Sequence, residues 1–404
     1  MKLLIINQPL NNRGDESAHK ALIRALINQI EDINIKVLFV GGNPNSIEQF
    51  AIKDPHITYI NLTPAKAYSK FSIPILKRHL YFLWNLHPTI RKIIKLTREV
   101  DWVVCAPGGI CMGGFQNWEH IFLLEIARIL HKKIAYYGRS IGPFPTETKS
   151  EQLFKKISIN LLKCFSFISI RDKKSEKLAN SLNLKYTPTV DSAFLDSPKV
   201  ELPIDIQCHL AVKKYIVFVP NLLIWHYKYK GCVTKETILS FYSSLLKCIF
   251  TKYPFFNIIM LPQTFNYGSY EGDDIHFFKE LKNFTNDERI IIIPDRYSSD
   301  IQQTIISNAE FVVGARYHSI VFSINNNVPF VALSYEHKIE GLLETLNKKD
   351  RMIDITKTFG NKENIEKTIQ LFNEKITTLS KDKEAQTRAK KIANNCLKQF
   401  IEII

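Results

Sequence analysis

The amino-acid sequence predicts an α/β protein of two doubly wound, Rossmann-like domains that face each other across a cleft. Short apolar runs alternate with helical patterns along the chain, as in parallel sheets whose strands are joined by helices. The alternation breaks once, around residues 195–212, where Asp and Pro interrupt the pattern. A chain of 404 residues suits two domains of roughly 200 residues each better than one.

Each predicted domain has its own series of elements. In the first, apolar runs bounded by Gly, Pro or charge predict strands at 2–6, 35–40, 102–105, 134–137 and 167–170, with helices at 16–29, 118–130, 151–162 and 173–181. In the second, strands are predicted at 215–219, 256–261, 290–293, 311–314 and 330–333. Residues 62–100 are irregular, aromatic and basic, and fit the alternation poorly.

These series place an N-terminal domain at 1–200 and a C-terminal domain at 210–375. A Lys-rich helix at 376–404 follows, and we expect it to pack back on the N-terminal domain. Doubly wound folds bind ligands at the carboxyl ends of their parallel strands. Loops directly after strands are therefore the candidates for chemistry.

The chain is basic, with 54 Lys and Arg against 39 Asp and Glu and a formal net charge of +15. Such an excess attracts polyanions, so nucleic acid, anionic lipid and phosphorylated metabolites all fit as partners. Seven cysteines without a Cys-x-x-Cys pair predict reduced thiols and no zinc site, and no run of 18 apolar residues occurs. The apolar N-terminus reads as a first buried strand rather than a signal peptide, which fits a reducing cytoplasm.

Two loops after predicted strands contain glycine. Residues 11–16 include Asn12, Gly14 and Asp15. A glycine permits a tight turn there, and N–H groups at a helix start favour an anion, although Asp15 also fits a plain N-cap. Residues 106–114 hold four glycines, of which Gly108 and Gly109 come first, and neither a Walker nor a Gly-x-Gly-x-x-Gly motif is present.

Arginines follow two more strands of the first domain. Arg139 lies between Gly138 and Gly142, and Arg171 precedes Asp172. A planar guanidinium at a strand end suits phosphate or carboxylate. For Arg171, an ion pair with Asp172 or a contact that stabilises the domain is the alternative.

The segment 314–319, Gly-Ala-Arg-Tyr-His-Ser, is the most informative. Residues two apart in an extended segment point the same way, so Arg316 and His318 can face one ligand. Arginine supplies a fixed charge, and histidine exchanges a proton near neutral pH. Segment 334–338 adds Tyr335 and Lys338. Carboxylates such as Asp15, Asp191 and Glu336 lack the spacing of a magnesium site, so we expect an anion site without a metal.

Together these motifs resemble those of the polysaccharide pyruvyl transferase family. The similarity lies near the start at 12–16, in the middle at 169–175 and 190–193, and towards the end at 313–319, 328–329 and 334–338. It extends over about residues 1–345. The last motif, with its Arg-x-His pair, is the most specific.

The resemblance implies a fold similar to GT-B glycosyltransferases, with the acceptor on the N-terminal domain and the donor on the C-terminal one. It implies phosphoenolpyruvate as donor and co-substrate, no further cofactor, and a cyclic pyruvate ketal on a hexose of a surface glycan, with phosphate released. We expect Arg316 and Arg171 to bind the donor and His318 to act as general acid. The expected substrate-binding residues are Asn12, Gly14, Asp15, Gly108, Gly109, Arg139, Asp191, Tyr335 and Lys338.

A lipid-linked glycan acceptor would give the basic surface a role. Cations around 66–98 and in the Lys-rich tail would then hold the enzyme at the inner face of an anionic membrane, while a merely solvated basic face is the alternative.

Two other functions stay open. One is a GT-B glycosyltransferase with a nucleotide-sugar donor, and the other is a non-catalytic nucleic-acid binder. We expect no nucleic-acid partner, because the cations lie at strand ends and no nucleic-acid module is recognisable.

Overall fold

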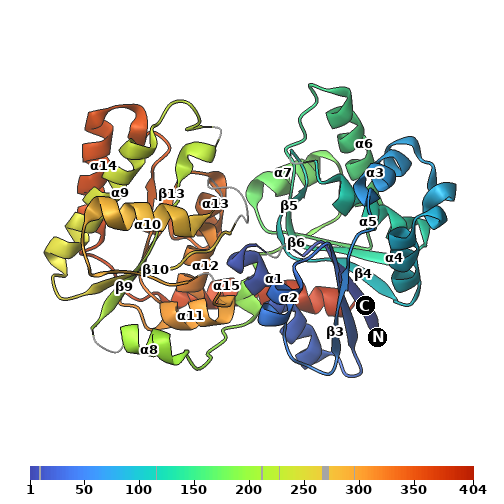
Figure 1. Cartoon of the computed structure of the whole chain (residues 1–404), viewed down its shortest axis with the longest axis horizontal. Helices are drawn as coiled ribbons and strands as arrows, with labels where there is room; N and C mark the ends of the chain where they lie inside the picture. Colours follow the sequence, from blue (N-terminus) through green and yellow to red (C-terminus); the bar gives the residue numbers. More distant parts are fainter. Residues whose placement is uncertain (9–10, 115, 211–212, 227, 266–272, 295) are drawn as a thin grey trace. The chain divides into compact units, whose positions relative to one another are not determined.

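The computed structural model describes residues 1–8, 11–114, 116–210, 213–226, 228–265, 273–294 and 296–404 (Figure 1). Its contacts divide the chain into two compact units. Unit 1 comprises Met1–Leu10, Asp15–Asp196 and Lys391–Ile404, and unit 2 comprises Asn11–Gly14 and Ser197–Lys390. We predicted domain boundaries at 1–200, 210–375 and 376–404 from the sequence. The division by contacts does not test these boundaries, which stay a prediction.

Unit 1 is built around a parallel sheet in the order β3-β2-β1-β4-β6-β7-β8, with β5 paired to β6. Its strands are β1 (Lys2–Ile6), β2 (Asn34–Val40), β3 (Ile57–Leu62), β4 (Trp102–Cys105), β5 (Gly108–Met112), β6 (Lys133–Ile141), β7 (Phe167–Ile170) and β8 (Thr187–Pro188). Its helices are α1 (Arg13–Gln29), α2 (Pro44–Phe50), α3 (Tyr68–Arg78), η1 (Tyr81–Leu86), α4 (Pro88–Arg98), α5 (Trp118–Ile129), α6 (Lys149–Cys164), α7 (Lys173–Ser181) and η2 (Ser192–Leu195).

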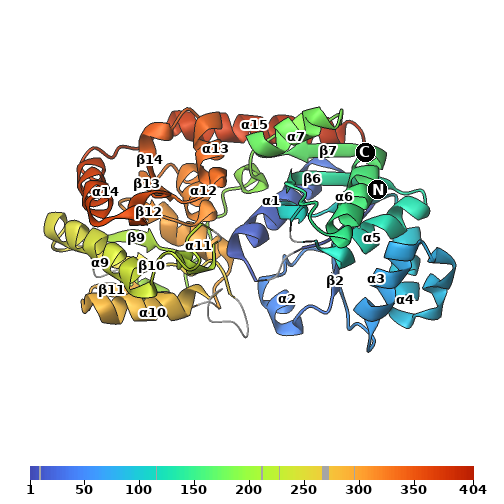
Figure 2. The same ribbon diagram turned by 90° about the horizontal axis from the view of Figure 1, so that it is seen from above.

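Unit 2 has a second parallel sheet, in the order β11-β10-β9-β12-β13-β14 (Figure 2). Its strands are β9 (Tyr215–Val219), β10 (Asn257–Met260), β11 (Ile290–Ile292), β12 (Val312–Gly314), β13 (Phe330–Ser334) and β14 (Met352–Asp354). Its helices are α8 (Ile204–Leu210), η3 (Leu223–Trp225), α9 (Lys235–Lys252), α10 (Asp274–Thr285), α11 (Ser299–Ser307), α12 (Tyr317–Asn325), α13 (His337–Thr345), η5 (Lys349–Arg351), η6 (Thr358–Gly360) and α14 (Lys362–Lys375). The final helix, α15 (Lys383–Ile401), begins in unit 2 and ends in unit 1.

Both sheets reverse their strand order beside the first strand of the unit. In unit 1 the chain builds outward from β1 through β2 to β3 and then returns to place β4 on the other side of β1. In unit 2, β12 returns to β9 in the same way. This is the doubly wound arrangement, in which ligands bind beyond the carboxyl ends of the strands where the order reverses. The predicted fold class of two Rossmann-like α/β domains is confirmed.

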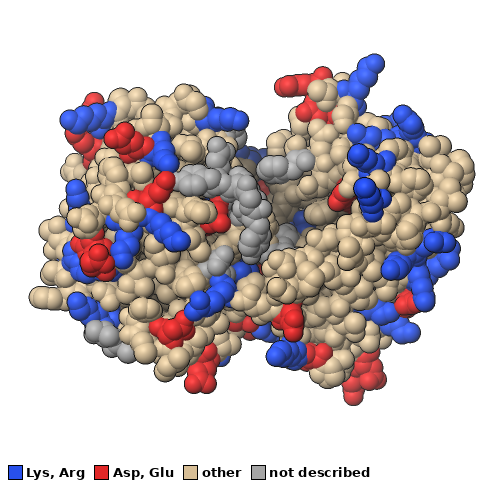
Figure 3. All heavy atoms as spheres, in the orientation of Figure 1, with Lys and Arg blue, Asp and Glu red and all other residues tan. Residues whose placement is uncertain are grey.

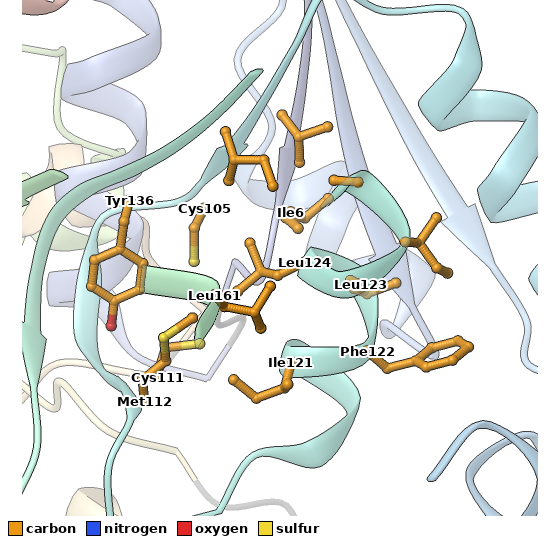
Figure 4. Packing of buried hydrophobic residues seen from close by; sticks show 14 of the residues in the cluster. Ile6, Cys105, Cys111, Met112, Ile121, Phe122, Leu123, Leu124, Tyr136 and Leu161 are labelled. Carbon is orange, nitrogen blue, oxygen red and sulfur yellow. The ribbon is translucent and has the colours of Figure 1, made fainter. Parts of the chain in front are cut away.

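The strands of unit 1 are buried on both faces, which explains why the sequence shows them as continuous apolar runs. Along β1, Leu3 and Ile5 join a cluster with α1 and the end of α15, whereas Leu4 and Ile6 join a cluster with α3 to α6. Figure 4 shows part of the second cluster, with Ile6 and side chains of α5. The sheet is therefore a shared wall between two cores.

The end of α15 belongs to the first of these cores. Phe400 is fully buried, and its ring centroid lies 5.8 Å from that of Trp102, 5.3 Å from Tyr137 and 5.0 Å from Phe167. Aromatic pairs at such distances add packing energy beyond the burial of their area. The Lys-rich tail thus contributes an apolar stripe to unit 1.

The structure differs from the sequence prediction at 106–114, which we expected to be a glycine-rich loop. Gly108–Met112 forms β5, which pairs in parallel with β6 through two register shifts. Cys111 and Met112 are buried, so the apolar residues after the glycines draw this segment into the sheet. Residues 62–100, which fitted no pattern, form α3, η1 and α4 after the end of β3.

All seven cysteines are free thiols in the structure. Within the described ranges, no helix combines the length and apolar character that crossing a membrane requires.

Candidate active site

The N-terminal motif forms hydrogen bonds with residues of unit 2 that lie about 250 positions later in the sequence. The Gln263 carbonyl accepts a 2.9 Å hydrogen bond from the Arg13 N–H, and the Phe265 N–H donates one of 2.9 Å to the Asn11 carbonyl. The Arg13 guanidinium lies 4.6 Å from the centroid of the Phe265 ring. Residues 11–14 therefore lie alongside residues 263–265, which follow β10, and Asn12 forms an antiparallel bridge with Thr264.

Within this motif, Asn12 directly precedes helix α1. Its side-chain oxygen accepts a 2.8 Å hydrogen bond from the Gly14 N–H, as an N-cap residue does. The capping role that we considered for Asp15 thus falls to Asn12, and Asp15 lies in the first helical turn.

Asp274, which the sequence analysis missed, organises the carboxyl edge of unit 2. One of its oxygens accepts hydrogen bonds from the N–H groups of Gln263 at 2.9 Å and Thr264 at 3.0 Å. Its other oxygen accepts from the Arg316 guanidinium. Asp274 is 2% exposed, so these bonds form away from water. One carboxylate thereby fixes both the catalytic arginine candidate and the segment 263–264, with which residues 11–13 pair.

The Asp273-Asp274 pair was a weak signal of this role. Asp273 caps α10, since its side chain accepts a 2.9 Å hydrogen bond from the Ile275 N–H. One acidic residue at a helix start is explained by capping, and the second has to find another partner. The sequence could show the surplus carboxylate but not the arginine 42 positions away that it binds.

Arg316 and His318 come from the junction of β12 and α12. Arg316 is the N-cap residue of α12, and its backbone carbonyl accepts a 2.6 Å hydrogen bond from Ser319. Burial works against the positive charge of Arg316, but the Asp274 carboxylate outweighs it, so the pKa of the guanidinium is raised. Arg316 is thus a permanent cation whose charge is partly balanced.

His318 lies directly against the backbone of Gly14. A Cβ atom added to Gly14 would stand 1.7 Å from His318 Nδ1, closer than any real contact. His318 is 7% exposed, and its ring centroid lies 5.0 Å from that of Tyr317. The glycine of the N-terminal motif is required because the imidazole occupies the space of its missing side chain.

Tyr335 and Lys338 follow β13 in the same unit. Tyr335 is 4% exposed, and its ring centroid lies 5.4 Å from that of His226. Burial, with the Glu336 carboxylate as a second cause, raises the pKa of the Tyr335 phenol, so it is a neutral hydrogen-bonding group. Lys338 lies 3.4 Å from the Glu336 carboxylate.

In unit 1, Arg139 ties three chain segments together. Its guanidinium donates to the carbonyls of Ala106, of Gly109 at 3.3 Å and of Asn7 at 2.8 Å. A Cβ at Gly108 would stand 3.1 Å from Asp15 Oδ1. Arg139 is 2% exposed and uses its donors on the backbone. The structure therefore brings Asp15, Gly108, Gly109 and Arg139 together, with Arg139 as an internal support.

Arg171 and Asp191 form a buried ion pair elsewhere in unit 1. The Arg171 guanidinium donates to Asp191, and the two side chains are 4% and 0% exposed. Asp172, considered as the partner, instead caps α7 by accepting a 2.8 Å hydrogen bond from the Ser175 N–H. The stabilising contact that we considered for Arg171 is thus present, and its partner is Asp191. Contact of Arg171 with a donor substrate stays a prediction.

The expected site residues thus gather in separate groups. Unit 2 brings together Asn12, Gly14, Arg316 and His318, with Tyr335 within electrostatic reach of Arg316. Unit 1 holds the group around Arg139 and the Arg171–Asp191 pair. Nowhere in the described part of the chain do three or more His, Cys, Asp or Glu side chains form a group that could hold a metal ion.

Comparison with known proteins gives a family match. The model of the family described as polysaccharide pyruvyl transferase matches residues 12–337. Among curated proteins, the chain is 23% identical over 379 residues to the amylovoran biosynthesis protein AmsJ of Erwinia amylovora, with 88% of each chain covered.

Solved structures show the same architecture. The UDP-N-acetylglucosamine 2-epimerase of Rickettsia bellii matches with a TM-score of 0.57 and 13% identity over 100% of this chain and 95% of that one. The UDP-GlcNAc 2-epimerase of Neisseria meningitidis matches with a TM-score of 0.55 and 12% identity over 100% and 99%. At such identities the likeness shows the fold alone, which is of the GT-B type.

The position of Asp274 predicts a large loss of stability in Asp274→Ala. The substitution leaves the Arg316 charge and two N–H groups without their acceptor, and removing one partner of a buried ion pair costs about 3–5 kcal/mol. Urea unfolding measures the change. Asp287→Ala, which breaks the more exposed pair with Arg289, is the control and should cost less than about 1 kcal/mol. Equal losses in the two variants would contradict the role given to Asp274.

Proposed function

Because the chain belongs to the polysaccharide pyruvyl transferase family, we propose that it transfers pyruvate from phosphoenolpyruvate to a hexose of a surface glycan as a cyclic ketal. The observation that carries the proposal is the pairing of Arg316 with His318 at the carboxyl edge of unit 2, with Gly14 against the imidazole. Phosphoenolpyruvate has two anionic groups, and the fork of Arg316 suits either of them. Lys338, at the next strand end, is the second proposed cation.

The proposed reaction begins with proton transfer from the imidazolium of His318 to the methylene carbon of phosphoenolpyruvate. The C=C electron pair forms the new C–H bond, and C2 becomes an oxocarbenium-like centre. A sugar hydroxyl adds to C2 and loses its proton, after which the C2–O bond to phosphate breaks. A second hydroxyl of the same hexose then adds to C2 and loses its proton, so the products are the cyclic ketal and phosphate.

A positioned general acid of this kind typically contributes about 10²- to 10⁴-fold in rate. The support for His318 in this role is its place two residues from Arg316 and its own 7% exposure, which largely shields the imidazole from water. A nucleotide-sugar glycosyltransferase, the rival with the same fold, is not favoured, because the matched family model is that of pyruvyl transferases.

Incubation of the whole chain with phosphoenolpyruvate and a panel of lipid-linked and model glycosides tests the proposal. We expect phosphate release that depends on the glycan, together with a product whose mass exceeds that of the glycan by pyruvate less water. His318→Ala, compared at equal folded concentration, should lose at least about 10²-fold in turnover. Absence of this product across the panel, or transfer of sugar from a nucleotide sugar instead, would overturn the proposed function.

The contact between Gly14 and His318 predicts that Gly14→Ala is as harmful as loss of the imidazole. The new methyl group would displace the His318 ring, so turnover should fall by about 10²-fold or more while the protein stays folded. Gly341→Ala is the matched control, since no atom lies within 4 Å of the added Cβ. Steady-state kinetics and circular dichroism of both variants provide the measurement, and normal turnover in Gly14→Ala would remove the contact from the mechanism.

A lipid-linked acceptor would place the enzyme at the inner face of a membrane, and we propose that α3, η1 and α4 make this contact. Between Asp54 and Glu99 the chain carries eight Lys and Arg and no Asp or Glu. Figure 3 shows Lys and Arg over this region with few acidic residues among them. Phe82 and Leu86 of η1 are 76% and 69% exposed, so apolar side chains project from a basic surface.

We therefore expect co-sedimentation with vesicles that contain phosphatidylserine, weakened by salt because each basic residue contributes about 1 kcal/mol through screened attraction. Phe82→Ser with Leu86→Ser should reduce binding several-fold. Phe255→Ser, at an 80% exposed position of unit 2, is the control and should leave it unchanged. Equal binding to neutral vesicles, or no effect of the double substitution, would exclude this membrane contact.

A further inference from the structure

A hollow of 180 Å³ in unit 1 is not lined by any of the expected site residues. It lies beyond the carboxyl ends of β1 and β2, next to the start of α5. The polar residues that line it are Asn7, Gln8, Glu119 and His120, and Tyr68 adds an aromatic ring. This is the edge of the sheet where doubly wound folds bind ligands, because the strand order reverses beside β1.

Asn7 offers a buried acceptor at this hollow. Its amide nitrogen donates to the His120 carbonyl at 3.4 Å, while its side-chain oxygen has no hydrogen-bond partner among the described residues. The residue is 4% exposed, and its φ of 64° lies in the left-handed region. Arg139 holds it there through the 2.8 Å hydrogen bond to its carbonyl. A strained, buried amide with an unused acceptor is typical of a ligand-binding position.

Glu119 adds a carboxylate to the hollow, and His120 adds an imidazole. The Glu119 carboxylate accepts a hydrogen bond from Ser69, which fixes its position. Burial, aided by the nearby positive charge of Arg139, lowers the pKa of His120 to about 4, so its ring is neutral at physiological pH. The Nδ1 atom of this ring lies 3.8 Å from Cys111 Sγ, so Nε2 is the ring nitrogen that suits a hydroxyl group of a ligand.

Tyr68 gives the hollow a rigid apolar wall. Its ring centroid lies 6.5 Å from that of Phe122 and 5.9 Å from that of His87. No Lys or Arg is among the residues that line the hollow, so it offers no cation to a phosphate. Its volume is below the roughly 300–1,000 Å³ of sites for drug-sized ligands. The combination fits a small, neutral ligand that carries several hydroxyl groups.

We propose that this hollow binds one hexose ring of the acceptor glycan, with Asn7, Glu119 and His120 as hydrogen-bonding partners of its hydroxyls. The assignment of the ligand as an acceptor rests on the proposed function. The binding itself does not, because it follows from the geometry and polarity of the hollow. Glu119 and His120 are binding residues in this proposal and take no part in the chemistry of the donor.

Saturation-transfer NMR of the whole chain with methyl glucopyranoside, galactopyranoside and mannopyranoside, without phosphoenolpyruvate, tests the binding. We expect at least one of the three to bind. Glu119→Gln and His120→Gln should each raise its Kd by about tenfold, because each removes or weakens a hydrogen bond to a charged or buried group. The exposed Glu147→Gln and His131→Gln are matched controls and should leave the Kd unchanged.

The outcomes separate this proposal from the proposed function. Failure of all three glycosides to bind, or an equal Kd in the site and control variants, overturns the hexose site even if phosphoenolpyruvate is consumed. Binding that depends on Glu119 and His120 supports the site even if no ketal forms. Where turnover is measured, the two site variants should raise the KM of the glycan about tenfold and leave the KM of phosphoenolpyruvate unchanged.

Discussion

The hydrogen bonds of the Asp274 carboxylate are the constraint on which the candidate site depends. One oxygen holds the backbone after β10 and the other holds Arg316, so two segments that are remote in sequence share one buried acceptor. Charged hydrogen bonds are strong when buried, and a buried charge without its partner is costly. The arginine of the Arg-x-His pair is therefore kept in one orientation before any substrate binds. Such preorganisation reduces the reorganisation that the reaction requires.

The position of the N-terminal motif depends on this arrangement. Its sequence lies at the start of unit 1, yet residues 11–14 belong by contact to unit 2. The segment fixed by Asp274 pairs with Asn11 and Arg13, which places Gly14 against His318. An imidazole with 7% exposure that touches a glycine backbone has little freedom to turn. The motif thus forms a wall beside the Arg-x-His pair, and its expected contact with an anion stays a prediction.

In unit 1, a buried cation, Arg139, plays a role similar to that of the Asp274 carboxylate in unit 2. Arg139 is buried and donates to three carbonyls at the ends of β1 and β4 and within β5. Its donors are directed at the backbone, it holds the Asn7 carbonyl, and its charge helps to lower the pKa of His120, while contact of Arg139 with substrate stays a prediction. In each unit, then, a buried ionic group, Asp274 or Arg139, ties together segments at the carboxyl edge of the sheet.

The sequence by itself determined the fold class, most of the strands and the Arg-x-His motif, because these depend on local patterns. Strands such as β1 and β4 are buried on both faces and so show as unbroken apolar runs, whatever their partners are. The sequence misjudged β5, where four nearby glycines outweighed a short apolar run, and it missed Asp274 and the hollow beside Asn7. Only the tertiary structure decided those, since a carboxylate's partner, a glycine's neighbour and the volume of a hollow depend on residues that the chain brings together from far apart.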